Sequence, residues 1–137
     1  MGQDTEMHRS RLTGALFDVA DDVFAAETSF WSGALGSPPK PNEDDDDYEF
    51  LEGLFSGLQV MVQRIGVGAP ARVHLDIETD DVEAEVQRLE RLGAVKVEAV
   101  ETWWIMRDPA GLLFCVVRVQ SPVEFAAHAT TWDDPAV

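Results

Sequence analysis

Apolar and polar residues alternate most clearly over residues 72–79, which predicts a β-strand. The apolar and polar sets are Val73, Leu75 and Ile77 on one side, and His74, Asp76 and Glu78 on the other. A helix is predicted next, over residues 82–92, because apolar residues recur there at intervals of three or four. Asp80 stands where its N-cap is expected, and Gly93 where it ends. We expect the apolar side of the strand to face the core and His74 to face a concavity.

The same strand–helix pattern occurs in the first half of the chain. Residues 17–23 (FDVADDV) resemble residues 75–82 (LDIETDDV), and residues 56–62 (SGLQVMV) resemble residues 110–116 (AGLLFCV). Two copies are too few for a solenoid, so they favour a domain with an internal pseudo-two-fold repeat. Each half is predicted to run β-α-β-β-β, over residues 12–66 and 71–120, with the flexible connector 66–70 between them.

The ends of the chain are predicted to lie outside the repeat. Residues 1–11 are polar and are expected to be loose. Residues 121–137 are expected to form a C-terminal helix and tail. Ser121 begins a capping box with Pro122 at the first helical position. The acidic run at residues 43–47 lacks the glycine and spacing of an EF-hand loop, so it is interpreted as a solvated loop.

Charge and composition exclude several classes of partner. The 137 residues carry a net charge of −16, which argues against binding to nucleic acid or to anionic lipid. The single cysteine excludes an intrachain disulfide framework and fits a reducing compartment. Neither a secretory signal nor a membrane-spanning run is visible in the sequence, so a cytoplasmic protein is expected.

Several segments together resemble the glyoxalase-like branch of the vicinal oxygen chelate (VOC) superfamily. They are residues 74–77 (HLDI), 80–82 (DDV), 92–93 (LG), 104–111 (WIMRDPAG) and 114–116 (FCV). The superfamily includes glyoxalase I, extradiol dioxygenases, and the bleomycin- and fosfomycin-resistance proteins. The resemblance covers about residues 12–120. It implies an α+β fold, in which two βαβββ repeats form a curved mixed sheet.

The resemblance also implies where a metal would bind. Metal-using members take a His or Gln from the first strand and a Glu from the last strand of each half. The matching positions here hold His74, Cys115, Leu16 and Met61. Two of these four cannot supply a ligand to a divalent ion in the usual way, so we expect no metal site and no cofactor. A soft metal held by His74 and Cys115 would need Gln63 or Asp76 as well.

The candidate site residues are those expected to face the concavity. We predict that Leu16, Asp18, Met61, Gln63, His74, Asp76, Trp104 and Cys115 bind a ligand. His74 is the catalytic candidate, because imidazole exchanges protons near neutral pH. The equivalent carboxylates Asp18 and Asp76 can serve acid–base chemistry or join the two halves. Cys115 lies in an apolar strand, where a buried, unreactive thiol is the simpler interpretation.

Three functions agree with these features. The favoured one is binding of a small organic molecule in an apolar cleft without the full metal site, as in a bleomycin-resistance-type protein. The second is a lyase or isomerase that uses His74, so whether the protein is an enzyme stays open. The third is a non-enzymatic interaction module. A homodimer is expected in each case.

Overall fold

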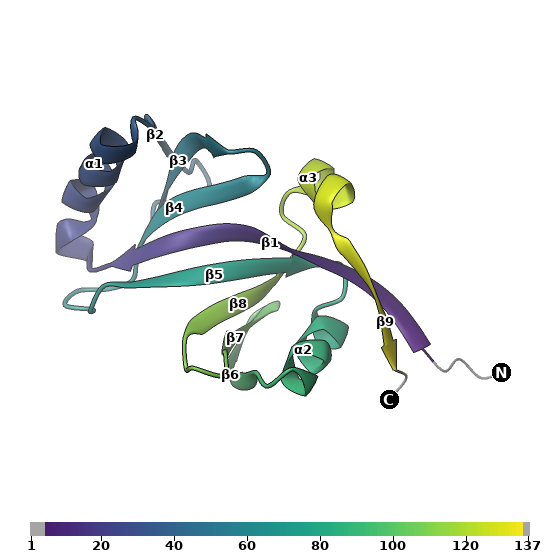
Figure 1. Cartoon of the computed structure of the whole chain (residues 1–137). Helices are drawn as coiled ribbons and strands as arrows, with labels where there is room; N and C mark the ends of the chain where they lie inside the picture. Colours follow the sequence, from purple (N-terminus) through teal and green to yellow (C-terminus); the bar gives the residue numbers. More distant parts are fainter. Residues whose placement is uncertain (1–4, 136–137) are drawn as a thin grey trace. The chain divides into compact units, whose positions relative to one another are not determined.

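The computed structural model describes residues 5–135, which form two compact units. The smaller unit comprises residues 14–74, and the larger unit comprises residues 5–13 and 75–135. Strands β1 (Thr5–Val19) and β5 (Arg72–Thr79) contribute residues to both units (Figure 1). The element order contains the two predicted βαβββ repeats, so the predicted α+β class is confirmed.

The smaller unit holds the first repeat. After β1 come a 3-10 turn (Asp21–Val23), α1 (Phe24–Leu35), β2 (Pro39–Pro41), β3 (Tyr48–Phe55) and β4 (Leu58–Arg64). Strand β4 pairs in parallel with β1 and antiparallel with β3, and β2 adds a short edge. Helix α1 ends at Gly36, whose φ of 67° is the left-handed conformation that glycine adopts without strain.

The core of the smaller unit lies between α1 and the strands. Its buried residues are Val19, Phe24, Leu51, Val60 and Val62. The rings of Phe17 and Trp31 stack at its edge, with centroids 4.9 Å apart. Burial of these side chains, at about 1.5–3 kcal/mol each, anchors the helix to the sheet and so fixes the strand face that carries the polar residues.

The larger unit holds the second repeat and the C-terminal elements. Helix α2 (Val82–Arg91) is followed by β6 (Val95–Val100), β7 (Trp103–Arg107) and β8 (Leu113–Arg118). Strand β8 pairs in parallel with β5 and antiparallel with β7, and β6 forms the edge. The N-cap of α2 is Asp81, whose side chain accepts a hydrogen bond from the backbone N–H of Ala84, and not the predicted Asp80.

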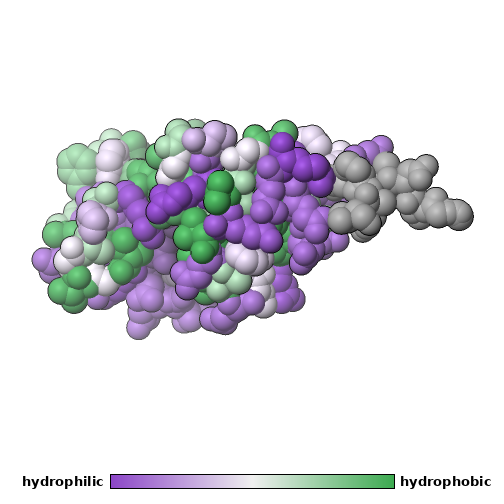
Figure 2. Space-filling view, turned by 90° about the horizontal axis from the view of Figure 1, so that it is seen from below, coloured by the Kyte–Doolittle hydropathy of each residue, from purple (hydrophilic) through white to green (hydrophobic). Residues whose placement is uncertain are grey.

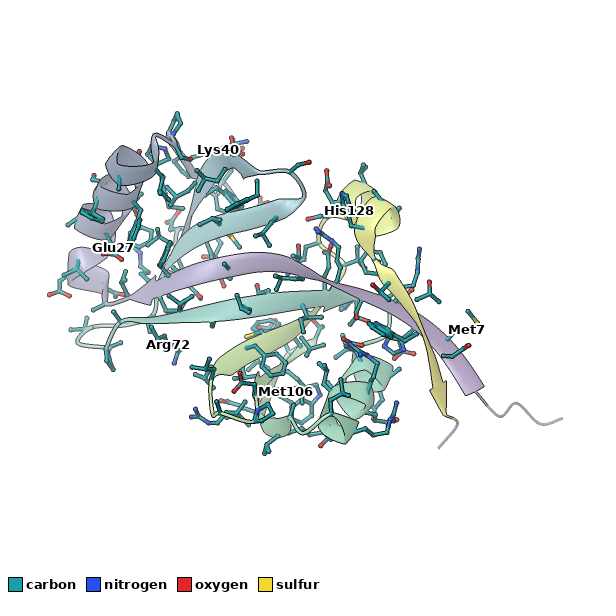
Figure 3. All side chains as sticks on the ribbon, viewed as in Figure 1. Met7, Glu27, Lys40, Arg72, Met106 and His128 are labelled. Carbon is teal, nitrogen blue, oxygen red and sulfur yellow. The ribbon has the colours of Figure 1, made fainter. Side chains whose placement is uncertain are left out.

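Helix α2 covers a core of Val86, Met106 and Val116. In Figure 3 the labelled Met106 lies near α2. Leu92 was expected on the same face but is exposed, because the helix ends at Arg91. Its backbone N–H instead closes the last turn of the helix by bonding the carbonyl of Arg88.

Strand β1 begins at Thr5. The prediction that the N-terminal segment is loose is therefore wrong for residues 5–11. Residues 1–4 lie outside the described residues. The partner that orders this part of β1 is β9 (Thr130–Pro135), which pairs with it antiparallel after α3 (Pro122–His128) (Figure 1). Trp132 of β9 donates a hydrogen bond from Nε1 to the hydroxyl oxygen of Ser10 on β1.

A buried hydrogen-bond network around Glu85 joins α2 to β1 within the larger unit. Glu85 accepts two bonds from Arg88 at 2.9 Å and lies 2.6 Å from Nε2 of His8. Burial raises the pKa of Glu85, but the hydrogen bonds from Arg88, His8 and Ser10 outweigh it, so the net pKa is lowered. The guanidinium of Arg88 also stacks on Trp132, 3.8 Å from the ring centroid.

The side chain of Glu78 on β5 bonds the backbone just before α3. Its Oε1 accepts the backbone N–H groups of Gln120 and Ser121, and its Oε2 accepts a 2.7 Å bond from Arg11. The capping box predicted at Ser121 is therefore wrong, since its side chain makes no capping bond. A buried carboxylate replaces it, because a negative charge is favourable beside unpaired N–H groups.

The surface matches the acidic composition. Figure 2 shows one face on which hydrophilic residues surround small, separate hydrophobic patches. No helix in the described part of the chain has the length and apolar character needed to cross a membrane.

Candidate functional site

The polar side of β5 is more buried than its apolar side, which reverses the expected orientation of core and solvent. His74 is 8% exposed and Glu78 is fully buried, whereas Val73 is 54% and Leu75 43% exposed. Leu75 is not part of the Val86–Met106–Val116 core, which explains its exposure. Buried polar groups are tolerated where they are hydrogen-bonded, so their partners define the site.

Asp18 on β1 holds two side chains of β5. Its Oδ2 lies 2.6 Å from Nδ1 of His74 and accepts a 2.8 Å bond from Nε of Arg72. Asp18 is completely buried, and its other oxygen, Oδ1, has no hydrogen-bond partner within the described chain. An unpaired buried acceptor costs about 1–3 kcal/mol, a cost that native proteins rarely carry without a functional reason.

The bond to Asp18 fixes the orientation and tautomer of His74. A carboxylate at Nδ1 favours a proton on that nitrogen, as in carboxylate–histidine pairs at catalytic and metal sites. Exchange of a proton with a ligand would then take place at Nε2. The pair thus has the arrangement of a general base and the group that orients it.

The other predicted residues of the first half lie beside this pair. In the parallel register of β1 and β4, Leu16 is opposite Met61 and Asp18 is opposite Gln63. Gln63 donates a 2.9 Å bond to the hydroxyl of Tyr48 on β3. The smaller unit therefore brings two apolar side chains and a polar group of β1 and β4 together beside Asp18.

In the larger unit, Asp76 and Cys115 are opposite each other in the parallel register of β5 and β8. Trp104 is not beside them: its register partner is Val116, and it packs on the core under α2. Ile105, in turn, is the partner of Cys115. The structure therefore places Trp104 on the opposite face of the sheet from Cys115, and the sequence assigned it to the wrong face.

The residues do not fit the four-ligand metal set of the VOC superfamily. Leu16, at one of those positions, is 1% exposed and packs as a core residue. A different set is available: His74 and Asp76 alternate along β5, and Cys115 is the strand partner of Asp76. These three form a candidate metal-ligand group with one nitrogen, one oxygen and one sulfur donor. The expected absence of a metal therefore stays a prediction.

Sequence reasoning missed Arg72 and Tyr48, which contact Asp18 and Gln63 directly. Arg72 was detectable, because it precedes His74 by two residues and strand alternation places both on one face. Tyr48 gave no such signal, since its contact with Gln63 depends on how β3 and β4 pair.

Solved structures with the same fold support this assignment of the architecture. An NAD-dependent benzaldehyde dehydrogenase from Legionella pneumophila matches with a TM-score of 0.59 at 13% identity, over 78% of this chain and 98% of the other. The Mn(II)-bound glyoxalase from Novosphingobium aromaticivorans matches with a TM-score of 0.56 at 19% identity, over 82% of this chain and 40% of the other.

Methylmalonyl-CoA epimerase from Mycobacterium tuberculosis matches with a TM-score of 0.52 at 16% identity, over 85% of this chain and 91% of the other. At these identities the matches show the fold and leave the reaction open. No curated protein matches the sequence. The model of the glyoxalase-like domain matches residues 15–117, which include both βαβββ repeats from Ala15 onward and every candidate site residue. The chain therefore belongs to the glyoxalase-like domain family.

Proposed function

We propose that the protein binds a small organic molecule beside His74 and transfers a proton within it, as a lyase or isomerase does. The observation that carries this proposal is the buried Asp18–His74 pair, with 2.6 Å between Oδ2 and Nδ1. Asp18 fixes the ring, and Nε2 takes a proton from an acidic C–H bond and returns it to a neighbouring atom of the same molecule.

In this proposal the body of the ligand packs against Leu16 and Met61 once binding has exposed them. Both are buried, and they are opposite each other on β1 and β4, next to the Asp18–Gln63 pair. Binding sites for small molecules are commonly apolar with a few fixed polar groups, and this face has that composition.

Two measurements test the proposal. A thermal-shift screen of small organic molecules should find compounds that raise the melting temperature of the wild-type protein but not of Leu16→Glu. The compounds found are then incubated in D2O, where the wild-type protein should catalyse exchange of one C–H for C–D. His74→Gln should still bind them and lose the exchange. Binding that neither substitution affects would place the ligand elsewhere and contradict the proposal.

Binding without catalysis, of the bleomycin-resistance type, is the second candidate, and it is favoured by the apolar Leu16–Met61 pair. It predicts that the same compounds bind and that no deuterium is incorporated. The acidic chain would then attract cationic ligands over distance, so their affinity should fall as salt concentration rises.

A metal-assisted site is a third candidate, favoured by the group of His74, Asp76 and Cys115. A metal bound there would polarise a ligand oxygen. Elemental analysis of protein purified without chelators tests this: one equivalent of a transition metal per chain, lost in Cys115→Ser, would support it.

We also propose that two copies of the chain associate and that the protein acts in the cytoplasm. Val73 and Leu75 expose apolar side chains on β5, and an exposed apolar strand face gains stability when a second copy covers it. Nucleic acid and anionic membranes are not expected as partners, because of the net charge of −16.

A further inference from the structure

We propose that Arg72 binds an oxyanion of the ligand, so that the site selects small organic molecules that carry a carboxylate or phosphate group. This inference rests on the proposed function, since it names the class of ligand that lies beside His74. It adds a residue that the sequence did not single out.

The guanidinium of Arg72 is held at one nitrogen. Within residues 5–135, the hydrogen bond that it makes to the protein is the 2.8 Å bond from Nε to Oδ2 of Asp18. The Arg72 side chain is 47% exposed, while Asp18 is completely buried. In Figure 3 the labelled Arg72 side chain extends from the beginning of β5. The buried carboxylate thus orients the group and leaves its two Nη nitrogens for a ligand.

Arginines of the larger unit bond the protein in different ways. Arg9, like Arg72, bonds a carboxylate through Nε, that of Asp80, and its guanidinium lies over the ring of Phe125. Arg11 uses its Nη nitrogens on Leu12 and Thr13, and Arg88 donates from both Nε and Nη2 to Glu85. The chain has 26 acidic and 10 basic residues, so carboxylates are abundant partners for arginine. Within the described residues no carboxylate bonds the Nη edge of Arg72, so this edge is open to another group.

The chemistry of a guanidinium decides the class of ligand. Its planar fork of N–H donors matches the two oxygens of a carboxylate or phosphate, and such charge-assisted bonds are about twice as strong as neutral ones. The net negative charge of the protein opposes an anion only weakly at this point, since charges beyond about 8 Å are screened at physiological ionic strength.

The position of Arg72 also suits the proposed proton transfer. Arg72 and His74 alternate on the same face of β5 and share the Oδ2 atom of Asp18. An oxyanion on Arg72 would therefore place the adjacent part of the ligand toward His74. The anion anchors the ligand, and the apolar pair of Leu16 and Met61 accommodates its body.

The test uses the full-length protein and three probes with one phenyl ring each: benzoate, phenyl phosphate and neutral benzamide. The chain has three histidines, so imidazole C–H signals in two-dimensional NMR spectra resolve His74 from His8 and His128. At constant ionic strength, at least one of the two anions should shift the His74 signal saturably while His128 stays unchanged. Benzamide should bind at least about tenfold more weakly.

Variants assign the effect to one side chain. Arg72→Gln should weaken binding of the anion about tenfold to a hundredfold, because it removes charge-assisted hydrogen bonds. Arg72→Lys keeps the charge without the fork, and a smaller loss is expected. Arg118→Gln removes an exposed arginine at the end of β8 and serves as the matched control, with binding unchanged.

Three results would overturn the inference: no saturable shift with either anion, equal affinity for benzamide, or unchanged anion binding by a folded Arg72→Gln or Arg72→Lys protein. These results leave the proposed function intact if the thermal-shift screen still finds ligands that depend on Leu16 and exchange that depends on His74. The proposed function fails on that screen, whatever the anions do.

Discussion

Asp18 is the residue on which the geometry of the candidate site depends. One buried oxygen holds the imidazole of His74 and the guanidinium of Arg72, so a single carboxylate sets the position of both side chains. Removing the charge of Asp18 is costly chiefly for His74, because that buried side chain loses its charged partner and has little access to water, whereas Arg72 is half-exposed.

Asp18→Asn tests this dependence directly. The amide keeps the shape of the side chain but cannot accept charge-assisted bonds from two donors with the same strength. We expect the free energy of unfolding, measured by urea denaturation, to fall by about 1–3 kcal/mol. Asp22→Asn, on the exposed 3-10 turn, is the control and should change it by less than about 0.5 kcal/mol. Equal effects of the two substitutions on the free energy of unfolding would show that Asp18 contributes no more to stability than an exposed aspartate.

At the scale of single residues, the sequence indicated which strand positions are equivalent but not the partners of the side chains there. Asp18 was found because residues 17–23 repeat the pattern of residues 75–82, and repetition places equivalent residues on equivalent strands. Its contact with His74 depends on how residues 56 positions apart meet in space, which no local pattern encodes. Strand alternation likewise showed which residues of the strand share a face with Trp104, but not which face of the sheet α2 covers.

Among the elements, the β1–β9 pair is the part that the sequence missed. The segment 130–135 is short and ends in proline, and the segment 5–11 is polar. Neither therefore shows the alternation of apolar and polar residues that is typical of a half-buried strand. Side-chain bonds and ring contacts support the pair instead, as Trp132 bonds Ser10 and stacks on Arg88 of α2. The repeat elements, whose cores are apolar, were predicted closely: the strand predicted over residues 72–79 is β5, and the helix predicted over residues 82–92 is α2, which ends one residue earlier.

Because of Glu85, the stability of the contact between α2 and β1 depends on pH. The pKa of Glu85 is lowered in the folded protein, so its contribution to stability is complete above the unfolded value of about 4.3 and is lost as pH falls through the lower folded value. The free energy of unfolding of the wild-type protein should therefore decrease below about pH 4.3.

Glu85→Gln removes this one titration. The variant is expected to be less stable than the wild type at neutral pH and to approach it as the pH falls below about 4.3. Urea denaturation at a series of pH values measures the difference between the two. Glu83→Gln, an exposed position on the same helix, should instead give a curve parallel to that of the wild type. A parallel curve for Glu85→Gln would contradict the role of its carboxylate.

For the whole molecule, net charge and exposed apolar surface act in opposite directions. Two copies with a charge of −16 each repel one another, whereas covering Leu75 and Val73 removes apolar surface from water. Salt screens the first effect and leaves the second nearly unchanged. If the chain forms the proposed dimer through β5, the dimer should therefore become more stable as salt concentration rises.

Leu75→Asp tests both the association and its location. Sedimentation velocity of the wild-type protein is expected to show a dimer that is strengthened by salt, and the variant should sediment as a monomer at all salt concentrations, because a buried unpaired carboxylate at the interface is costly. Circular dichroism should show that the variant stays folded, since Leu75 is exposed within one chain. Val123→Asp, at an exposed apolar position on α3, is the matched control and should remain a dimer. A wild-type monomer under all conditions would rule out the dimer, and dimerisation of the variant would move the interface away from β5.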